Sequence, residues 1–290
     1  LLGGGLARSI IKSGAGDFAA SGGSTDLPSG SAFTASGGGI IEMIFPALGA
    51  TTPVAVSAAE TPFGEASISI TDGGLNLLAN GSGNSTAQLY QIASAISLGG
   101  TVTLDANRIS GSSSNKTFQL PGLTLAADTV LSMAGDFTHG VALAGPLALQ
   151  GGATLKGIDI SGKDGLLTLG GGISGGAVDE LTIDGGTSLL NLTINAASTY
   201  GGGTTMNASN VTLGATGAFG TGPTVLNGGS LIVNADGALG GSVTLNGGTL
   251  RANGNNALAS NSVVLGGGTL DLRNNTTSTM NIAALTVSGT

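Results

Sequence analysis

Apolar and polar residues alternate within short runs along this chain. In the run 242–245, Val243 and Leu245 are separated by a threonine. Because successive side chains of a strand point to opposite faces, a period of two predicts a strand with one buried face. Similar short apolar runs occur at 66–71, 101–104, 118–120, 123–125 and 249–252. We therefore predict an all-β fold.

These runs recur at a nearly fixed interval. Gly-Gly-Ser-Leu at 228–231 returns as Gly-Gly-Thr-Leu at 247–250 and again at 267–270. A period of about 20 residues is typical of repeat proteins, in which each unit buries its apolar face by stacking on its neighbour. The short strands within the period predict a right-handed parallel β-helix over residues 100–290.

The period also predicts which side chains stack. Leu231, Leu250 and Leu270 follow the double glycine in three successive repeats, so we expect them to form one inward column. Arg251 and Asp271 come next in their repeats, and we expect them to be outward neighbours on adjacent coils. Successive coils should lie about 4.8 Å apart.

Asn227 and Asn246 occupy equivalent turn positions. Stacked amides of this kind can hydrogen-bond along the axis as an Asn ladder. Asparagine is also an ordinary turn residue that tolerates left-handed backbone, and both interpretations are compatible.

Before the repeats, residues 1–84 form an irregular β region that contains most of the prolines and shows no clean period. This region is interpreted as a small β domain or as imperfect early coils. Its short alternating run at 66–71 predicts a strand.

A short capping helix is predicted over residues 85–99. Ser85 and Gln88 have the spacing of a capping box, and three apolar residues then follow at helical steps: Leu89, Ile92 and Ile96. A helix at this place would cover the open edge of the first coil, whose unpaired backbone groups would otherwise recruit another strand.

Composition supports a folded chain. Hydrophobic residues make up 40% and charged residues 8% of the 290 residues, whereas disorder requires low hydrophobicity and high charge. The 55 glycines lack the strict one-in-three period of collagen and punctuate turns instead.

Charge and residue types exclude several classes of partner. The net charge is −8 and only eight Lys and Arg are present, so we expect no nucleic-acid binding. The absence of cysteine excludes disulfides and thiolate metal sites. The longest apolar run, Ile40–Leu48, is far shorter than the ~20 residues that span a bilayer, so no direct membrane insertion is expected. The chain begins without Met and ends within the repeat pattern, and we interpret it as a fragment of a longer protein.

Residues 165–250 resemble the autotransporter-associated β-strand repeat. The resemblance rests on Gly-Ile-Ser-Gly-Gly within 166–176, the strand-like run 181–186, Thr-Tyr-Gly-Gly-Gly-Thr-Thr within 199–208, and Gly-Ala-Phe-Gly-Thr-Gly-Pro at 217–223. Phe219 replaces the usual leucine, and Gly203 is an additional glycine. Residues 85–125 also resemble the cap and first coil of pectate-lyase-like helices.

The resemblance implies an exported bacterial surface protein, the passenger stalk of an autotransporter or a related adhesin, located extracellularly on the bacterial cell surface. The membrane barrel of that class has no counterpart in this sequence. The repeat carries no catalytic residues. Surface glycans, proteins of host or neighbouring cells, and further copies of the same chain are the expected partners.

No catalytic, cofactor-binding or metal-ligating residue is predicted. Asp179, Glu180 and Asp184 are the densest carboxylate cluster, but the first two are sequence neighbours that would point to opposite faces of a strand. His139 is the only histidine, and no nucleophile motif accompanies it in the required order. The run 157–163 matches a phosphate-loop pattern except that Asp164 replaces the Ser or Thr.

We therefore expect no enzymatic activity and no cofactor. The sequence favours a structural and adhesive stalk that binds or displays through its side faces and turns. A self-assembling extracellular filament subunit is the first alternative. A polysaccharide-degrading enzyme on the same scaffold is the second, because fold alone does not decide function.

Overall fold

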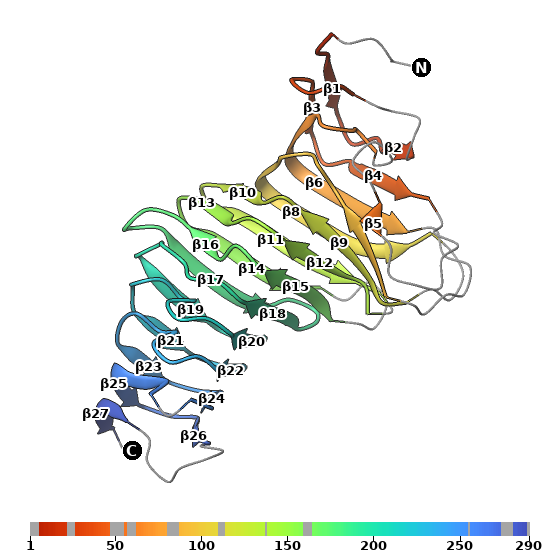
Figure 1. The fold of residues 1–290 in the computed structure, drawn as a ribbon. Helices are drawn as coiled ribbons and strands as arrows, with labels where there is room; N and C mark the ends of the chain where they lie inside the picture. The colour runs from red at the N-terminus through yellow and green to blue at the C-terminus, as the bar shows by residue number, and fades with distance from the viewer. Residues whose placement is uncertain are drawn as a thin grey trace.

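The computed structural model describes residues 6–21, 27–46, 55–56, 62–79, 87–109, 114–136, 138–158, 164–254, 256–273 and 281–288. In these ranges the protein is all-β and contains no helix, so no helix there could cross a membrane. Its strands stack one beside the next from β1 at one end to β27 at the other (Figure 1).

Two sheets contain all the named strands. Seventeen form sheet A. They are β1 (Ser9–Ser13), β2 (Phe18–Ser21), β3 (Ala32–Ser36), β4 (Ile40–Phe45), β6 (Ser67–Ala79), β8 (Ile96–Arg108), β10 (Leu123–Ala126), β11 (Thr129–Gly135), β13 (Leu147–Gln150), β14 (Ala153–Gly157), β16 (Ile173–Ser174), β17 (Glu180–Gly185), β19 (Gly203–Met206), β21 (Thr224–Leu226), β23 (Val243–Leu245), β25 (Leu258–Leu265) and β27 (Ile282–Val287).

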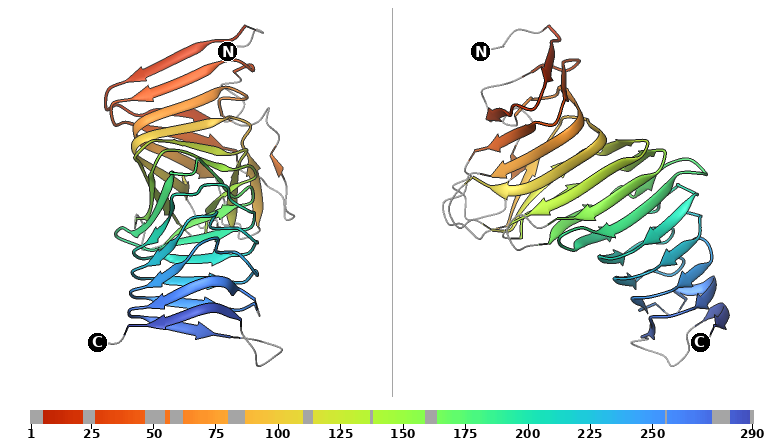
Figure 2. Two further views of the ribbon diagram at one scale, coloured as in Figure 1. Left: turned by 90° about the vertical axis from the view of Figure 1, so that its left-hand side faces the viewer. Right: turned by 180° about the vertical axis from the view of Figure 1, so that it is seen from behind.

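Ten strands form sheet B. They are β5 (Ala55–Val56), β7 (Gln88–Gln91), β9 (Lys116–Leu120), β12 (Gly140–Leu143), β15 (Gly165–Leu169), β18 (Leu190–Ile194), β20 (Asn210–Leu213), β22 (Ser230–Val233), β24 (Thr249–Ala252) and β26 (Thr269–Leu272). Figure 2 shows the same stack from two further sides.

Within sheet A and within sheet B, every pairing between named strands is parallel. In the C-terminal half the chain alternates between the sheets, so that β21 pairs with β23 and β23 with β25, while β22 pairs with β24 and β24 with β26. Each strand therefore hydrogen-bonds to its equivalents in the coils before and after it. The predicted strands at 242–245 and 249–252 are confirmed as β23 and β24. This arrangement is compatible with a parallel β-helix.

Coil length changes along the stack. The strands β6 and β8 are long enough to pair with two strands each: β6 pairs with β3 and β4, and β8 pairs with β10 and β11. The pairing then continues from β10 to β13 and from β13 to β16. Between β13 and β16, Leu147 pairs with Ile173, whereas between β21 and β23 Leu226 pairs with Leu245, a shorter step along the chain. Beyond β16 each repeat supplies one strand to each sheet. The period seen in the sequence belongs to these shorter C-terminal coils.

The inward leucine column is confirmed. Leu231 pairs with Leu250, which pairs with Leu270, and the first two are completely buried. Leu270 is partly buried against the same core because β26 ends sheet B in the described residues. A buried leucine contributes roughly 1.5–3 kcal/mol relative to an exposed one, so a column of them holds neighbouring coils together.

Double glycines allow the coils to approach at the turn into sheet B. Gly248 has a φ of +70°, and a Cβ there would lie 2.5 Å from the carbonyl oxygen of Gly229 in the preceding coil. A side chain would therefore clash with backbone and also strain the turn. Ser209, one coil before Gly229, has a φ of +83°, and its buried hydroxyl accepts from Leu190 N and donates to Asp184 O. These two bonds hold Ser209 in this left-handed conformation.

The predicted capping helix is wrong. Gln88–Gln91 forms strand β7, and β8 begins at Ile96, whereas Ser85 lies outside the described residues. The helix prediction rested on the spacing of Leu89, Ile92 and Ile96 and did not consider Tyr90. Its ring is completely buried and packs 5.3 Å from Phe45 and 5.4 Å from Phe118 between ring centroids. Burial of this ring and the pairing of β7 with β9 override the local helical pattern.

Strands before residue 84 belong to the same stack. Ala32 of β3 pairs with Ser9 of β1 and with Ser67 of β6, and β6 pairs in turn with β8. The strand predicted at 66–71 is the first half of β6. In the described residues, sheet A thus runs without a break from the irregular region into the coils that follow.

Leu250→Ala should destabilise the protein strongly, because it opens a cavity in the closed leucine column. We expect the free energy of unfolding to fall by about 2–5 kcal/mol. Arg251→Ala, its outward neighbour, is the matched control and should change stability little. Urea unfolding followed by circular dichroism measures both. Equal sensitivity of the two variants would contradict the inward register.

Candidate interaction surface

The outward face of sheet A is regular over the last coils. Thr205, Val225, Thr244, Val264 and Thr286 are register partners in β19, β21, β23, β25 and β27. We call them the Thr/Val column. In the first three of these strands, each member lies between two buried residues, so its side chain points outward. Their spacing along the axis is that of adjacent strands, about 4.8 Å.

This face carries no charge in the described residues. Between 203 and 288 the charged side chains are Asp236, Arg251, Asp271 and Arg273. Arg251 and Asp271 belong to sheet B, Arg273 directly follows β26, and Asp236 lies in a turn after β22. A partner at the Thr/Val column would therefore meet hydroxyl and methyl groups. Without fixed charges, any recognition at this face would depend on shape, hydrogen bonds and apolar contact.

An Asn ladder borders the Thr/Val column. Asn246 Nδ2 donates to Asn227 Oδ1, and Asn227 Nδ2 donates to Asn207 Oδ1, each at 2.9 Å. The three residues directly follow β23, β21 and β19. The ladder predicted from Asn227 and Asn246 is confirmed, and it extends one coil further to Asn207. Each amide satisfies its neighbour, which fixes the spacing of the turns along this edge.

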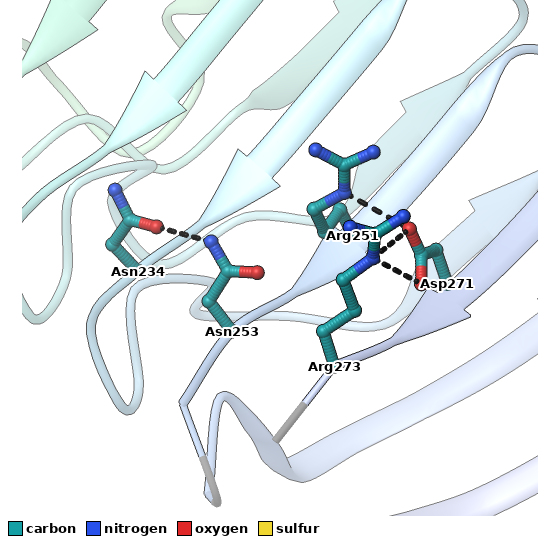
Figure 3. Close-up of polar contacts among 5 residues, drawn as sticks. All are labelled: Asn234, Arg251, Asn253, Asp271 and Arg273. Atoms are coloured by element: carbon teal, nitrogen blue, oxygen red, sulfur yellow. Dashed lines mark hydrogen bonds and ion pairs between the residues drawn. The ribbon is translucent and has the colours of Figure 1, made fainter. Parts of the chain in front are cut away.

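Sheet B presents a charged group instead. Arg251 Nε donates to Asp271 Oδ2 at 2.9 Å, and Arg273 Nε contacts the same oxygen at 2.9 Å (Figure 3). The hydrogen bond from Arg251, more than any other influence, holds the pKa of Asp271 below its usual range. The expected Arg251–Asp271 neighbours are confirmed. A second amide pair, Asn253 Nδ2 donating to Asn234 Oδ1 at 2.7 Å, lies near this group.

Asp164 connects two further coils. Its carboxylate accepts hydrogen bonds from Ser188 Oγ at 2.6 Å, Leu189 N at 3.2 Å and Asn191 Nδ2 at 3.2 Å. Asn191 Oδ1 in turn accepts from Asn210 at 3.0 Å. These bonds, led by the one from Ser188, hold the pKa of Asp164 below its usual range. Sequence reasoning considered Asp164 only beside the phosphate-loop pattern, most of which, at 159–163, lies outside the described residues.

Two hollows lie on the described surface near acidic residues. One, of about 550 Å³, is lined by Asp164, Thr187, Ser188 and glycines. The other, of about 250 Å³, is lined by Asp128, Glu180 and neighbouring threonines. Apart from the acidic residues and Leu189, the residues that line them are glycine, alanine, serine and threonine.

The carboxylates of Asp179, Glu180 and Asp184 have different surroundings and do not form one site. Asp179 Oδ2 accepts from Gly176 N at 2.7 Å and stabilises a turn, while Asp184 lies 3.8 Å from Lys156 Nζ. Glu180 faces the smaller hollow. His139 is buried beside the other sheet, directly before β12. In the described residues no group of three or more His, Cys, Asp or Glu side chains is placed to hold a metal ion.

Comparison with known proteins does not identify a relative: no family model, no curated protein and no solved structure matches the chain.

Asn227→Ala should destabilise the Asn ladder, because it removes both the donor to Asn207 and the acceptor for Asn246. We expect the free energy of unfolding to fall by about 1–2 kcal/mol. Thr205→Ala, an outward change in a neighbouring coil, should cost less. Urea unfolding compares them, and a neutral Asn227→Ala would show that the ladder contributes nothing to stability.

Asp164 should make stability depend on acid pH. Its pKa is depressed in the folded protein, so its contribution is present above the unfolded carboxyl pKa of about 3.9 and is lost as pH falls through the folded value. Wild type should therefore lose more thermal stability than Asp164→Asn between pH 5 and pH 2. Parallel melting-temperature curves for the two proteins would rule out this contribution.

Proposed function

We propose that this chain is a section of the elongated stalk of an exported bacterial surface protein, folded as a right-handed parallel β-helix. The stalk displays or binds partners through its side faces and turns. The observation that carries the proposal is the parallel pairing of coil on coil from β1 to β27. A stack of this kind extends in one direction and presents the same face at every step.

The resemblance of residues 165–250 to the autotransporter-associated repeat supports the same proposal. Its motif residues have structural roles in this stack. Tyr200 is completely buried and its hydroxyl is hydrogen-bonded to Thr204, and Phe219 is completely buried as well. Burial raises the pKa of the Tyr200 hydroxyl, which keeps it neutral. Residues that fill the core in this way serve the scaffold and leave recognition to the outward positions.

The distribution of carboxylates argues against a polysaccharide-degrading enzyme. Glycoside hydrolysis needs two carboxyl groups about 5–10 Å apart across the scissile bond. At 179–184 one carboxylate is held by a backbone N–H and another by a lysine. The neutral Thr/Val column is instead suited to an uncharged partner, such as a neutral surface glycan.

Negative-stain electron microscopy of the purified chain should show short, single rods. Binding is then tested on arrays of neutral glycans at low and high salt. Because the Thr/Val column has no charge, binding through it should change little with salt. Thr244→Glu, in the middle of this face, should abolish that binding. Thr249→Glu, an outward change on sheet B, is the matched control and should retain it.

Three outcomes would contradict the proposal. Long fibres of many chains would support the filament alternative. Cleavage of a glycan, lost on substitution of a single aspartate, would support the enzyme alternative. Binding that survives Thr244→Glu but not Thr249→Glu would move the interaction from sheet A to sheet B.

A further inference from the structure

Two aspartates are buried where strand β8 pairs with strand β11. Asp105 lies within β8 and is 4% exposed, and Asp136 directly follows β11 and is 7% exposed. Aspartate is almost never buried to this extent unless its charge is paired. Removing an ionised carboxylate from water without compensation costs several kcal/mol or more. The pair therefore requires a physical explanation.

Each carboxylate has one oxygen with a protein partner and one without. Asn107 Nδ2 donates to Asp105 Oδ2 at 3.2 Å, and Arg108 Nη2 lies 3.6 Å from Asp136 Oδ2. The two Oδ1 atoms are completely buried and have no hydrogen-bond partner among the residues that the structure describes. Such groups are rare in folded proteins, and each one points to an unseen partner or to strain. Here two occur close together, one within β8 and one directly after its partner strand β11.

Strand register places the two carboxylates on the same part of sheet A. Asp105 pairs with Ala134 and Ala106 with Gly135, so Asp136, the next residue, falls opposite Asn107. Asn107 and Asp105 are two residues apart and share a face of β8, as their hydrogen bond requires. Burial raises the pKa of Asp105, and the nearby negative charge of Asp136 adds to the effect. The two carboxylates are thus close enough to repel each other.

Charge balance at this place is incomplete. Arg108 offsets one of the two negative charges through its ion pair with Asp136. Among the described residues, no ion pair is recorded for Asp105, and neither Oδ1 atom has a hydrogen-bond partner. Carboxylate oxygens are the ligands that hard divalent cations prefer, and Ca²⁺ completes its shell with backbone carbonyls and water. One divalent cation would more than offset the remaining negative charge, and it would give both unpartnered Oδ1 atoms a ligand bond.

We propose that Asp105 and Asp136 bind one divalent metal cation of the Ca²⁺ class through their Oδ1 atoms. Because one ligand comes from the coil of β8 and the other from the coil of β11, the cation joins two successive coils. The site lies away from the Thr/Val column and does not depend on the proposed adhesive role. Sequence reasoning missed it because the two residues are far apart along the chain and neither belongs to an acidic motif.

The test uses the whole chain after dialysis against a chelator. Isothermal titration calorimetry with Ca²⁺ at pH 7.5 should show saturable binding with one ion per chain at this site. Saturating Ca²⁺ should raise the melting temperature by several degrees. In the isosteric variants Asp105→Asn and Asp136→Asn, the affinity should fall at least tenfold and the thermal shift should disappear.

Asp184→Asn is the matched control, because Asp184 lies on the same sheet but already faces Lys156. It should keep both the Ca²⁺ binding and the thermal shift. The proposal is overturned if wild type neither binds nor is stabilised by millimolar Ca²⁺, Mg²⁺ or Mn²⁺. It is also overturned if both Asn variants respond like wild type. Stabilisation of wild type by mild acid alone, without any response to cations, would mean that Asp105 is buried as a neutral acid.

Discussion

The parallel hydrogen-bond ladder between successive coils is the constraint on which this structure depends. Each strand must find its equivalent one coil away, in register and at about 4.8 Å. A shift of one residue would turn every inward side chain outward. The alignment of Leu231 with Leu250 and Leu270 shows the register maintained over three coils. Core packing and ladder pairing therefore specify the same arrangement.

Turns must obey the same spacing, and the chain meets this requirement in three ways. Double glycines such as Gly247-Gly248 let backbone pass close to backbone. Buried hydroxyls replace missing ladder bonds: Ser198 Oγ accepts from Ile173 N at 2.9 Å and donates to Ala218 O at 2.7 Å. Asparagine amides bond to their equivalents one coil away, as Asn246 does to Asn227. The glycines thus provide steric room, whereas the hydroxyls and the amides provide hydrogen bonds from one coil to the next.

Sequence reasoning predicted the C-terminal coils well because their pattern is local and repeated. The inward leucines, the Arg251–Asp271 pair and the Asn ladder all follow from the short, regular period of the repeats. It failed at residues 85–99, where the decisive contact joins Tyr90 to Phe45, far earlier in the chain. The buried pair Asp105 and Asp136 was missed for the same reason. Nothing within either local segment indicates that the other will lie beside it.

The division between inward and outward positions also separates residues that stabilise the stack from residues that are available for the proposed recognition. Inward residues are fixed by the core, so a change there affects the whole stack. Outward residues such as Thr205 and Thr244 are free to vary without loss of pairing, and they repeat at the ladder spacing. A partner that contacts one coil of this face therefore meets similar chemistry on the next. In the proposed adhesive role, weak contacts would add along such a surface, because several coils would bind at once and each would raise the effective concentration of the next. Extended binding of this kind would need many small contacts and no deep pocket.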